Sequence, residues 1–142
     1  MTIKILTKKD LNEVVSKRIS SLFRQLSTSK KQQELSALLD QNNLTIAAYI
    51  EDTEILGIAS LGSYKTISGY KGWIEDVVVD ENARGKGIGR KLIEKLLEVG
   101  NQQGLTEILL FTEEHRQAAI HLYESLGFTQ KNSMIYNHKL AV

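Results

Sequence analysis

A short segment rich in glycine and in positively charged residues is the part of this sequence that points most directly to chemistry. Between a strongly apolar stretch and a helix-like stretch, the chain reads Asp80-Glu81-Asn82-Ala83-Arg84-Gly85-Lys86-Gly87-Ile88-Gly89-Arg90-Lys91. Glycines inside a helix start each cost up to about 1 kcal/mol of helix propensity, and cations there face the positive end of the helix dipole. A bound anion offsets both costs, because glycines let the backbone approach closely, amides donate hydrogen bonds and cations neutralise charge. The segment therefore predicts an anion-binding turn; the alternative is a flexible basic turn whose glycines only cap a helix.

The spacing of these residues excludes two common nucleotide-binding motifs. A Walker loop needs Gly-Lys-Ser/Thr, whereas Gly89 is followed by Arg90 and Lys91. A dinucleotide fingerprint that starts at Gly85 would need glycine at position 90. We therefore expect neither a nicotinamide dinucleotide nor a nucleoside triphosphate.

Length and composition limit the classes of protein that remain. The chain has 142 residues, which predicts a single domain over residues 1–142. Its 18 Lys and Arg balance 17 Asp and Glu, so no overall field favours nucleic acid or an anionic membrane surface. Cysteine is absent, which excludes thiol catalysis, and the first residues lack the apolar stretch of a signal peptide. We expect a cytoplasmic protein with no nucleic-acid or membrane partner.

Hydrophobic periodicity places the anion-binding turn within an α/β (α+β) fold, a mixed sheet with helices on both faces. The expected strands are residues 3–6, 44–50, 55–63, 73–79, 107–111 and 134–140. The expected helices are residues 11–26, a short one through 35–39, one that follows the turn and ends at Gly104, and residues 116–126. Residues 64–71 are expected to form a loop.

Two motifs together resemble the GNAT family of N-acetyltransferases. The sequence Arg84-x-x-Gly87-x-Gly89, preceded by three valines, matches the family signature Q/R-x-x-G-x-G/A. Farther along, Ala119-Ile120-His121-Leu122-Tyr123-Glu124-Ser125-Leu126-Gly127-Phe128 is similar to the second family motif, A-x-x-L/F-Y-x-x-x-G-F. The resemblance implies a GNAT fold, in which a mostly antiparallel central sheet splays in a V. It also implies acetyl-CoA as cosubstrate, with no metal.

The resemblance assigns residues to the coenzyme. The loop amides at Gly85, Gly87 and Gly89 would bind the pyrophosphate, and the pantetheine arm would lie along the strand at Val77 and Val79. The full set expected to contact the coenzyme is Val77, Val78, Val79, Arg84, Gly85, Lys86, Gly87, Ile88, Gly89 and Arg90. By family analogy, the N–H of Val77 or Val78 would donate to the oxyanion.

Two adjacent carboxylates precede the valines. A primary amine must lose a proton before it attacks a thioester, and Glu75 is the candidate general base, acting directly or through water. In similar enzymes the Glu-Asp step serves deprotonation and substrate binding, so Asp76 is the candidate ligand for the cationic amine. Strand alternation would place the two on opposite faces unless a bulge intervenes. The alternative for each is an ordinary charge at a water-facing strand edge.

Tyr123 is the expected acid for the departing thiolate, because the family places this tyrosine with its hydroxyl at the sulfur. The alternative is a core aromatic that shares a buried face with Ile120. Many relatives carry asparagine three residues before the alanine that matches Ala119, and this sequence has Arg116 there. That departure puts one contact to the pantetheine in doubt.

We therefore expect an acetyl-CoA-dependent N-acetyltransferase that modifies a primary amine of a small molecule by direct attack in a ternary complex. A protein or peptide N-acetyltransferase and a non-catalytic acyl-CoA-binding module are the alternatives. Relatives often form dimers, and the sequence leaves both a monomer and a homodimer open. The three histidines lack the spacing of metal ligands, which predicts no metal site.

Overall fold

The computed structural model describes residues 1–141 and divides into two compact units, Met1–Phe111 and Thr112–Val142. Each unit is described by itself below. The single domain expected from the length stays a prediction. Among the described residues, no helix combines the length and the apolar character that crossing a bilayer requires.

The first unit contains a five-stranded sheet in the order β1-β2-β3-β4-β5. Its strands are β1 (Thr2–Ile5), β2 (Leu44–Glu51), β3 (Glu54–Thr66), β4 (Gly69–Val79) and β5 (Glu107–Leu110). The first four strands pair antiparallel, and only β4 and β5 run parallel. This confirms the expected mixed, mostly antiparallel sheet.

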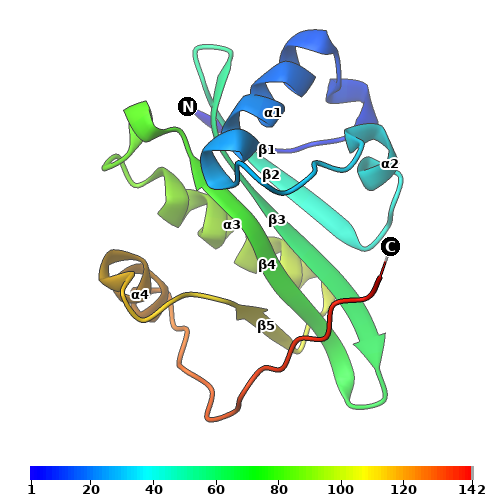
Figure 1. Cartoon of the computed structure of the whole chain (residues 1–142), viewed down its shortest axis with the longest axis vertical. Coiled ribbons are helices and arrows are strands. Elements are labelled where there is room, and N and C mark those ends of the chain that lie inside the picture. Colours follow the sequence, from blue (N-terminus) through cyan, green and yellow to red (C-terminus); the bar gives the residue numbers. More distant parts are fainter. Residues whose placement is uncertain (142) are drawn as a thin grey trace. The chain divides into compact units, whose positions relative to one another are not determined.

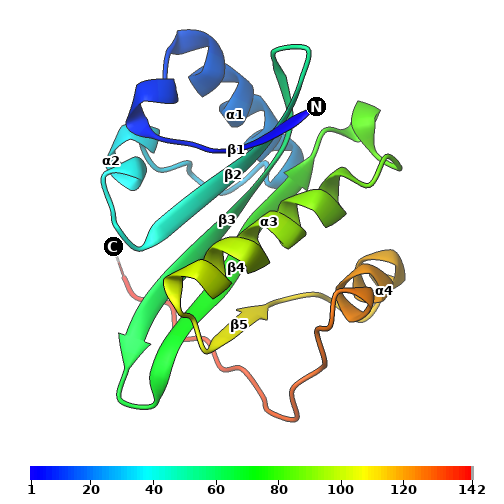
Figure 2. The ribbon, with the colours of Figure 1, turned by 180° about the vertical axis from the view of Figure 1, so that it is seen from behind.

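Helices cover both faces of this sheet (Figures 1 and 2). The helices of the first unit are the 3-10 turn η1 (Lys8–Asp10), α1 (Glu13–Leu26), α2 (Leu35–Leu39), the 3-10 turn η2 (Glu81–Ala83) and α3 (Ile88–Gln103). Helix α1 begins where the Asn12 side chain accepts from the Val15 N–H, an N-cap that satisfies one of the unpaired amides of the first turn.

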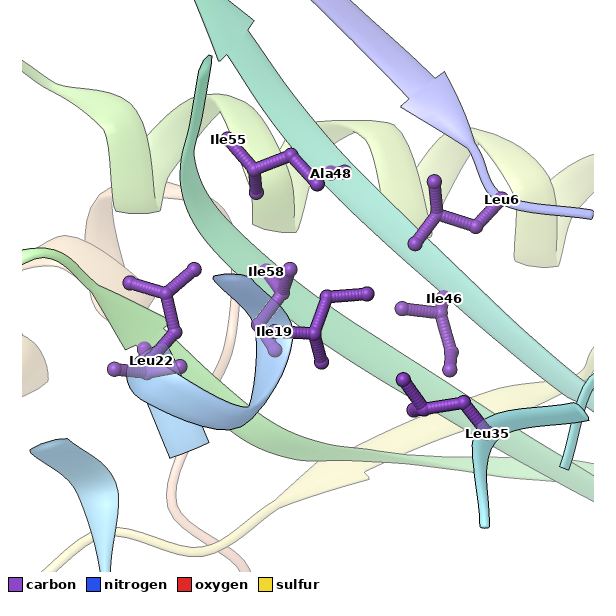
Figure 3. Packing of buried hydrophobic residues seen from close by; sticks show 9 residues of the cluster. Leu6, Ile19, Leu22, Leu35, Ile46, Ala48, Ile55 and Ile58 are labelled. Atoms are coloured by element: carbon purple, nitrogen blue, oxygen red, sulfur yellow. The ribbon is translucent and has the colours of Figure 1, made fainter. Parts of the chain in front are cut away.

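Two neighbouring residues on β3 show which helix covers which face. A Cβ placed on Gly57 would meet Ile88 and Leu92 of α3 at 3.0 and 3.1 Å. Ile58, which points the other way, belongs to the hydrophobic core on the α1 side (Figure 3). That core joins β2, β3 and β4 to α1 and α2; its buried members are Leu6, Ile19, Leu22, Leu35, Ile46, Ala48, Ile55, Ile58 and Val78.

Strand β4 contains a bulge between the two carboxylates and the valines. Ile58 of β3 lies opposite Val78, but Ser60 lies opposite Glu75, so two residues of β4 face one residue of β3. Asp76 adopts φ +51° at this point, in the left-handed region that Asp tolerates better than most residues. The bulge that would allow both adjacent carboxylates to reach the same face of the sheet is therefore present.

Two expectations about the chain are wrong. Residues 64–71 are not a loop, because β3 and β4 continue as a hairpin until Thr66 pairs with Gly69. Their polar composition reflects strands whose side chains face water. Residues 134–140 form no strand: they pair with none of the described residues of the second unit, and Met134, Ile135, Tyr136 and Leu140 are exposed.

The second unit contains one helix, α4 (Gln117–Ser125), in the described part of residues 112–142. The predicted helix over 116–126 is thus confirmed to within a residue at each end. The Phe128 N–H donates to the carbonyl of Tyr123, and Gly127 has φ +94°, which together form the helix-ending turn that glycine favours.

Candidate active site

The predicted anion-binding turn connects β4 to α3 and ends at Gly87, the N-cap of the helix. Gly85 and Gly87 have φ +83° and +76°, a backbone conformation that residues with a Cβ rarely adopt. The first hydrogen bond of α3 runs from the Lys91 N–H to the Gly87 carbonyl at 3.2 Å. The amides of Ile88 and Gly89 precede this bond, so the helix itself gives them no acceptor.

Gly89 has no steric or conformational requirement within the chain. Its φ is negative, and a Cβ there would meet only the Val79 side chain, at 3.8 Å. Alanine would therefore fit the protein alone and would favour the helix. A side chain at this position would, however, point toward the end of β4, where a ligand on the helix N-terminus would lie.

The second half of β4 has an open edge. Strand β5 pairs with β4 only along residues 71–74, opposite residues 107–110, among the residues that the structure describes. From Glu75 to Val79, β4 keeps its pairing with β3 but gains none from β5. Buried backbone groups are normally paired, so this edge, which ends at the anion-binding turn, is suited to an extended ligand that carries amides.

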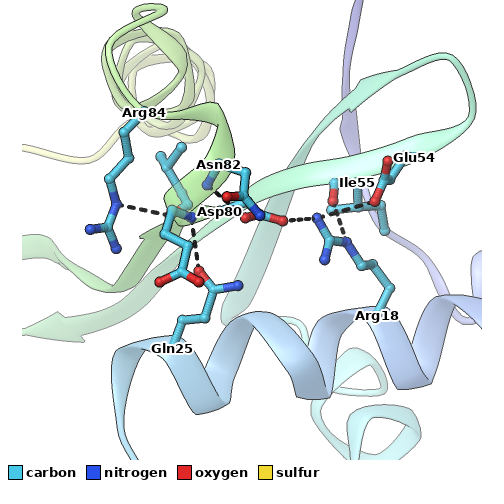
Figure 4. Close-up of polar contacts among 9 residues, drawn as sticks. Arg18, Gln25, Glu54, Ile55, Asp80, Asn82 and Arg84 are labelled. Carbon is cyan, nitrogen blue, oxygen red and sulfur yellow. Dashed lines mark hydrogen bonds and ion pairs between the residues drawn. The ribbon is translucent and has the colours of Figure 1, made fainter.

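A buried carboxylate holds the start of the turn (Figure 4). Asp80, 8% exposed, accepts from the Asn82 N–H at 3.0 Å and from the Arg18 guanidinium at 2.5 Å. Arg18 also donates to the Ile55 carbonyl at 2.7 Å, and Gln25 of α1 accepts from the Glu81 N–H at 2.9 Å. The hydrogen bond from Asn82 and then that from Arg18 hold the pKa of Asp80 below its ordinary value.

Glu75 lies in the opposite electrostatic situation. No hydrogen bond or ion pair holds its carboxylate among the described residues. The side chain is open to solvent, but protein atoms around it partly desolvate the carboxyl, which raises its pKa. The charge of Asp76 raises that pKa further, and the charge of Lys30 opposes both. A carboxylate with a raised pKa and an uncommitted oxygen is suited to accept and release a proton.

Glu75 shares its face of the sheet with α1. It pairs with Ser60, which is two residues from the core residue Ile58 and therefore points to the same side. Lys30, which follows α1, has its carbonyl held by Arg24 at 2.6 Å. Glu75, Asp76 and the valines thus follow one another along β4, which leads through the glycine turn into α3.

Tyr123 lies on α4 in the second unit. Its ring packs edge-on against Phe128, with centroids 6.0 Å apart, and it is half-buried. Partial burial raises the pKa of the Tyr123 hydroxyl, and the charge of Arg116 opposes this effect. The hydroxyl is therefore protonated at neutral pH and able to donate.

The sequence-based interpretation missed the residues that support the turn, which are Arg18, Gln25 and Asp80. Asp80 two residues before Asn82 is a typical helix-capping pattern and was a usable signal. Arg18 and Gln25 lie more than fifty residues away in sequence, and nothing in the pattern of α1 distinguishes them from ordinary exposed polar residues.

The chain belongs to the acetyltransferase (GNAT) family, whose model matches residues 11–128. Its sheet and helices agree with a solved aminoglycoside acetyltransferase from an uncultured soil metagenomic sample, crystallised with trehalose. That match has a TM-score of 0.83 at 22% identity and covers 99% of this chain and 96% of the other. At this identity the likeness shows the fold.

Two curated relatives match about half of the chain. An L-methionine sulfoximine/L-methionine sulfone acetyltransferase of Pseudomonas paraeruginosa is 37% identical over 57% of this chain and 48% of its own length. The L-amino acid N-acyltransferase MnaT of Escherichia coli is 34% identical over 55% of this chain and 46% of its own length. The chain therefore aligns with about half the length of these relatives.

Proposed function

We propose that this protein is an N-acetyltransferase that transfers the acetyl group of acetyl-CoA to a primary amine of a small molecule, by direct attack in a ternary complex. The observation that carries the proposal is the continuity of the open β4 edge with the glycine turn that begins α3. Family membership supports the reaction, and the relatives named for amino-acid substrates support a small amine as acceptor.

The residues present fit coenzyme A. A diphosphate needs several amide donors and positive charge; the turn offers the amides of Gly85, Gly87 and Gly89, with Arg84, Lys86 and Arg90 around them. An extended arm with amides would add along the open edge at Val77, Val78 and Val79, as a peptide adds to a sheet. Ile88, 2% exposed, fixes the start of the helix on the sheet.

When bound, acetyl-CoA supplies the acetyl group, and the thiol leaves as a nitrogen–carbon bond replaces the carbon–sulfur bond. Glu75 accepts the proton that the amine must lose, directly or through one water. Asp76 holds the amine while it is still a cation, and the N–H of Val77 or Val78 donates to the oxygen that gains charge. By the family resemblance, Tyr123 would give the leaving sulfur its proton; its hydroxyl is protonated at neutral pH.

The glycine turn provides the test of coenzyme binding. Coenzyme A at 100 times its dissociation constant should add about 2.7 kcal/mol to the free energy of unfolding, measured as a raised melting temperature. Gly89→Leu should fold, since a Cβ at this position meets only Val79 at 3.8 Å, yet lose that stabilisation because its side chain occupies the expected place of the ligand. Glu98→Leu on the exposed face of α3 is the matched control and should keep it.

Thiol release from acetyl-CoA in the presence of amines then tests the transfer. The absence of any thermal shift with saturating coenzyme A, or an equal shift in Gly89→Leu and the parent protein, would contradict the assignment of the turn. A clear shift without thiol release for any amine would favour a binding module over an enzyme.

A further inference from the structure

Three aromatic side chains gather on the sheet beside Glu75. The rings of Trp73 and Phe111 stack with centroids 4.8 Å apart, and the indole N–H of Trp73 donates to the Tyr64 hydroxyl at 3.3 Å. Tyr64 is 45% exposed and Phe111 is 54% exposed. We call Tyr64, Trp73 and Phe111 the aromatic platform. All three belong to the first unit.

The platform lies on the same face of the sheet as Glu75. Trp73 is two residues before Glu75 on β4, and Tyr64 is four residues after Ser60, the partner of Glu75 on β3. Side chains two or four residues apart along a strand share a face. Leu109, which pairs with Trp73, places Phe111 on that face as well.

None of the three rings belongs to the hydrophobic core of that face. Helices α1 and α2 lie over the upper part of the sheet in Figure 1, and the β3–β4 hairpin extends below them. Large apolar side chains that remain open to water beside uncommitted carboxylates are typical of a binding surface.

We propose that the aromatic platform binds the acceptor, and that the acceptor is a primary amine that carries an aromatic ring. The ring would stack on Trp73 and Phe111, and the amine would lie at Glu75 and Asp76. Charge complementarity supports this occupant: two carboxylates at one end of the platform favour a cation there, while the rings favour a flat apolar group. This inference rests on the proposed function and adds the substrate class.

The strand spacing sets the length of the acceptor. Trp73 and Glu75 are two residues apart, which corresponds to about 6.6 Å along a strand and hence to a linker of about two or three carbons between ring and nitrogen. We therefore expect 2-phenylethylamine and 3-phenylpropylamine to be better acceptors than benzylamine.

Binding can be measured without turnover because Trp73 is the only tryptophan of the chain. Its emission, excited where tyrosine does not absorb, should change saturably with 2-phenylethylamine in the coenzyme-A-bound protein. 2-Cyclohexylethylamine is the matched probe of similar size without an aromatic ring. Since aromatic stacking contributes about 0.5–1.5 kcal/mol beyond area burial, it should bind roughly two- to tenfold more weakly.

Phe111→Leu removes half of the stacked pair and keeps the fluorescent reporter. It should raise KM for 2-phenylethylamine several-fold, with little change in kcat, and leave KM for n-hexylamine nearly unchanged. Tyr64→Phe keeps the ring and loses only the hydroxyl, so it should retain most of the preference. Ile67→Ala, fully exposed in the β3–β4 turn, is the control and should change none of these values.

The outcomes separate this inference from the proposed function. Efficient acetylation of L-methionine sulfone or an aliphatic amine, with no preference for phenyl over cyclohexyl, would overturn the aromatic acceptor and leave the acetyltransferase in place. An equal loss for 2-phenylethylamine and n-hexylamine in Phe111→Leu would also overturn it. No thiol release with any amine would contradict the proposed function itself.

Discussion

Two carboxylates that lie five residues apart, Glu75 in strand β4 and Asp80 directly after it, have opposite electrostatic surroundings. Asp80 is buried at the end of the strand, where Asn82 and Arg18 donate to it and hold its pKa below its ordinary value. Glu75 lies at the bulge, where partial desolvation and Asp76 raise its pKa. Burial among hydrogen-bond donors therefore makes Asp80 a carboxylate that holds the fold together, whereas Glu75, exposed and without such donors, is available for proton transfer.

Glu75→Gln should produce the largest effect in this comparison. Loss of a general base lowers kcat by roughly 10²- to 10⁴-fold at neutral pH, and by less at high pH, where free amine is abundant. The free energy of unfolding should not fall, because a carboxylate with a raised pKa is destabilising when it is ionised. Steady-state rates and urea unfolding at several pH values measure both.

The control for that variant is Glu13→Gln, a carboxylate on α1 whose side chain is 81% exposed. Glu13→Gln should change neither kcat nor the free energy of unfolding by much. A fall in kcat of Glu75→Gln that is the same at every pH would instead indicate a structural role for Glu75.

Asp80→Asn should produce the converse pattern. The amide keeps the cap to Asn82 but loses the charged hydrogen bond to Arg18, which costs about 1.5–3 kcal/mol of unfolding free energy. Because the folded pKa of Asp80 is lowered, its contribution is present above the ordinary value of 3.8 and disappears as the pH falls through the folded value. Urea unfolding above pH 5 should show that Asp80→Asn has a lower free energy of unfolding than the parent protein. In stronger acid this difference should disappear.

Glu54→Gln is the matched control, because Glu54 contacts the same Arg18 at 3.4 Å but is 61% exposed. An exposed pair of this kind contributes at most about 1 kcal/mol. Equal destabilisation by the two variants would mean that burial of Asp80 does not matter.

The smallest expected effect is a pair of opposite shifts in the pH profile. Asp76 raises the pKa of Glu75, so Asp76→Asn should move the acidic limb of kcat/KM to lower pH. Lys30 lowers that pKa, so Lys30→Met should move the same limb to higher pH. Asparagine adopts the φ of +51° as readily as Asp76 does. Shifts in the same direction would contradict Glu75 as the group that titrates.

Local sequence patterns predicted much of the sheet and the glycine turn. Alternating apolar residues gave the β2–β3 hairpin, and the spacing Arg84-x-x-Gly87-x-Gly89 gave the start of α3. The bulge at Asp76 was recognised only as a requirement of two adjacent carboxylates, because no residue type in this stretch demands it. A positive φ at an aspartate comes from pairing with β3, not from local preference.

Where the sequence-based interpretation failed, the outcome depended on strand pairing that the residue types alone do not indicate. The polar residues 64–71 form a hairpin because each strand pairs with the other, and the apolar tail around Met134 and Tyr136 has no such pairing in its unit. The neighbourhood of Tyr64, Trp73 and Phe111 could be identified only from the register of three strands.

The bulge in β4 has a consequence for self-association. A strand with an unpaired edge is a template on which a strand of another molecule can add, and natural sheets discourage this with bulges and charges at the edge. Glu75 and Asp76 supply both features at the point where β5 departs. The residues proposed to serve an incoming amine would thereby also discourage aggregation along the open edge of β4.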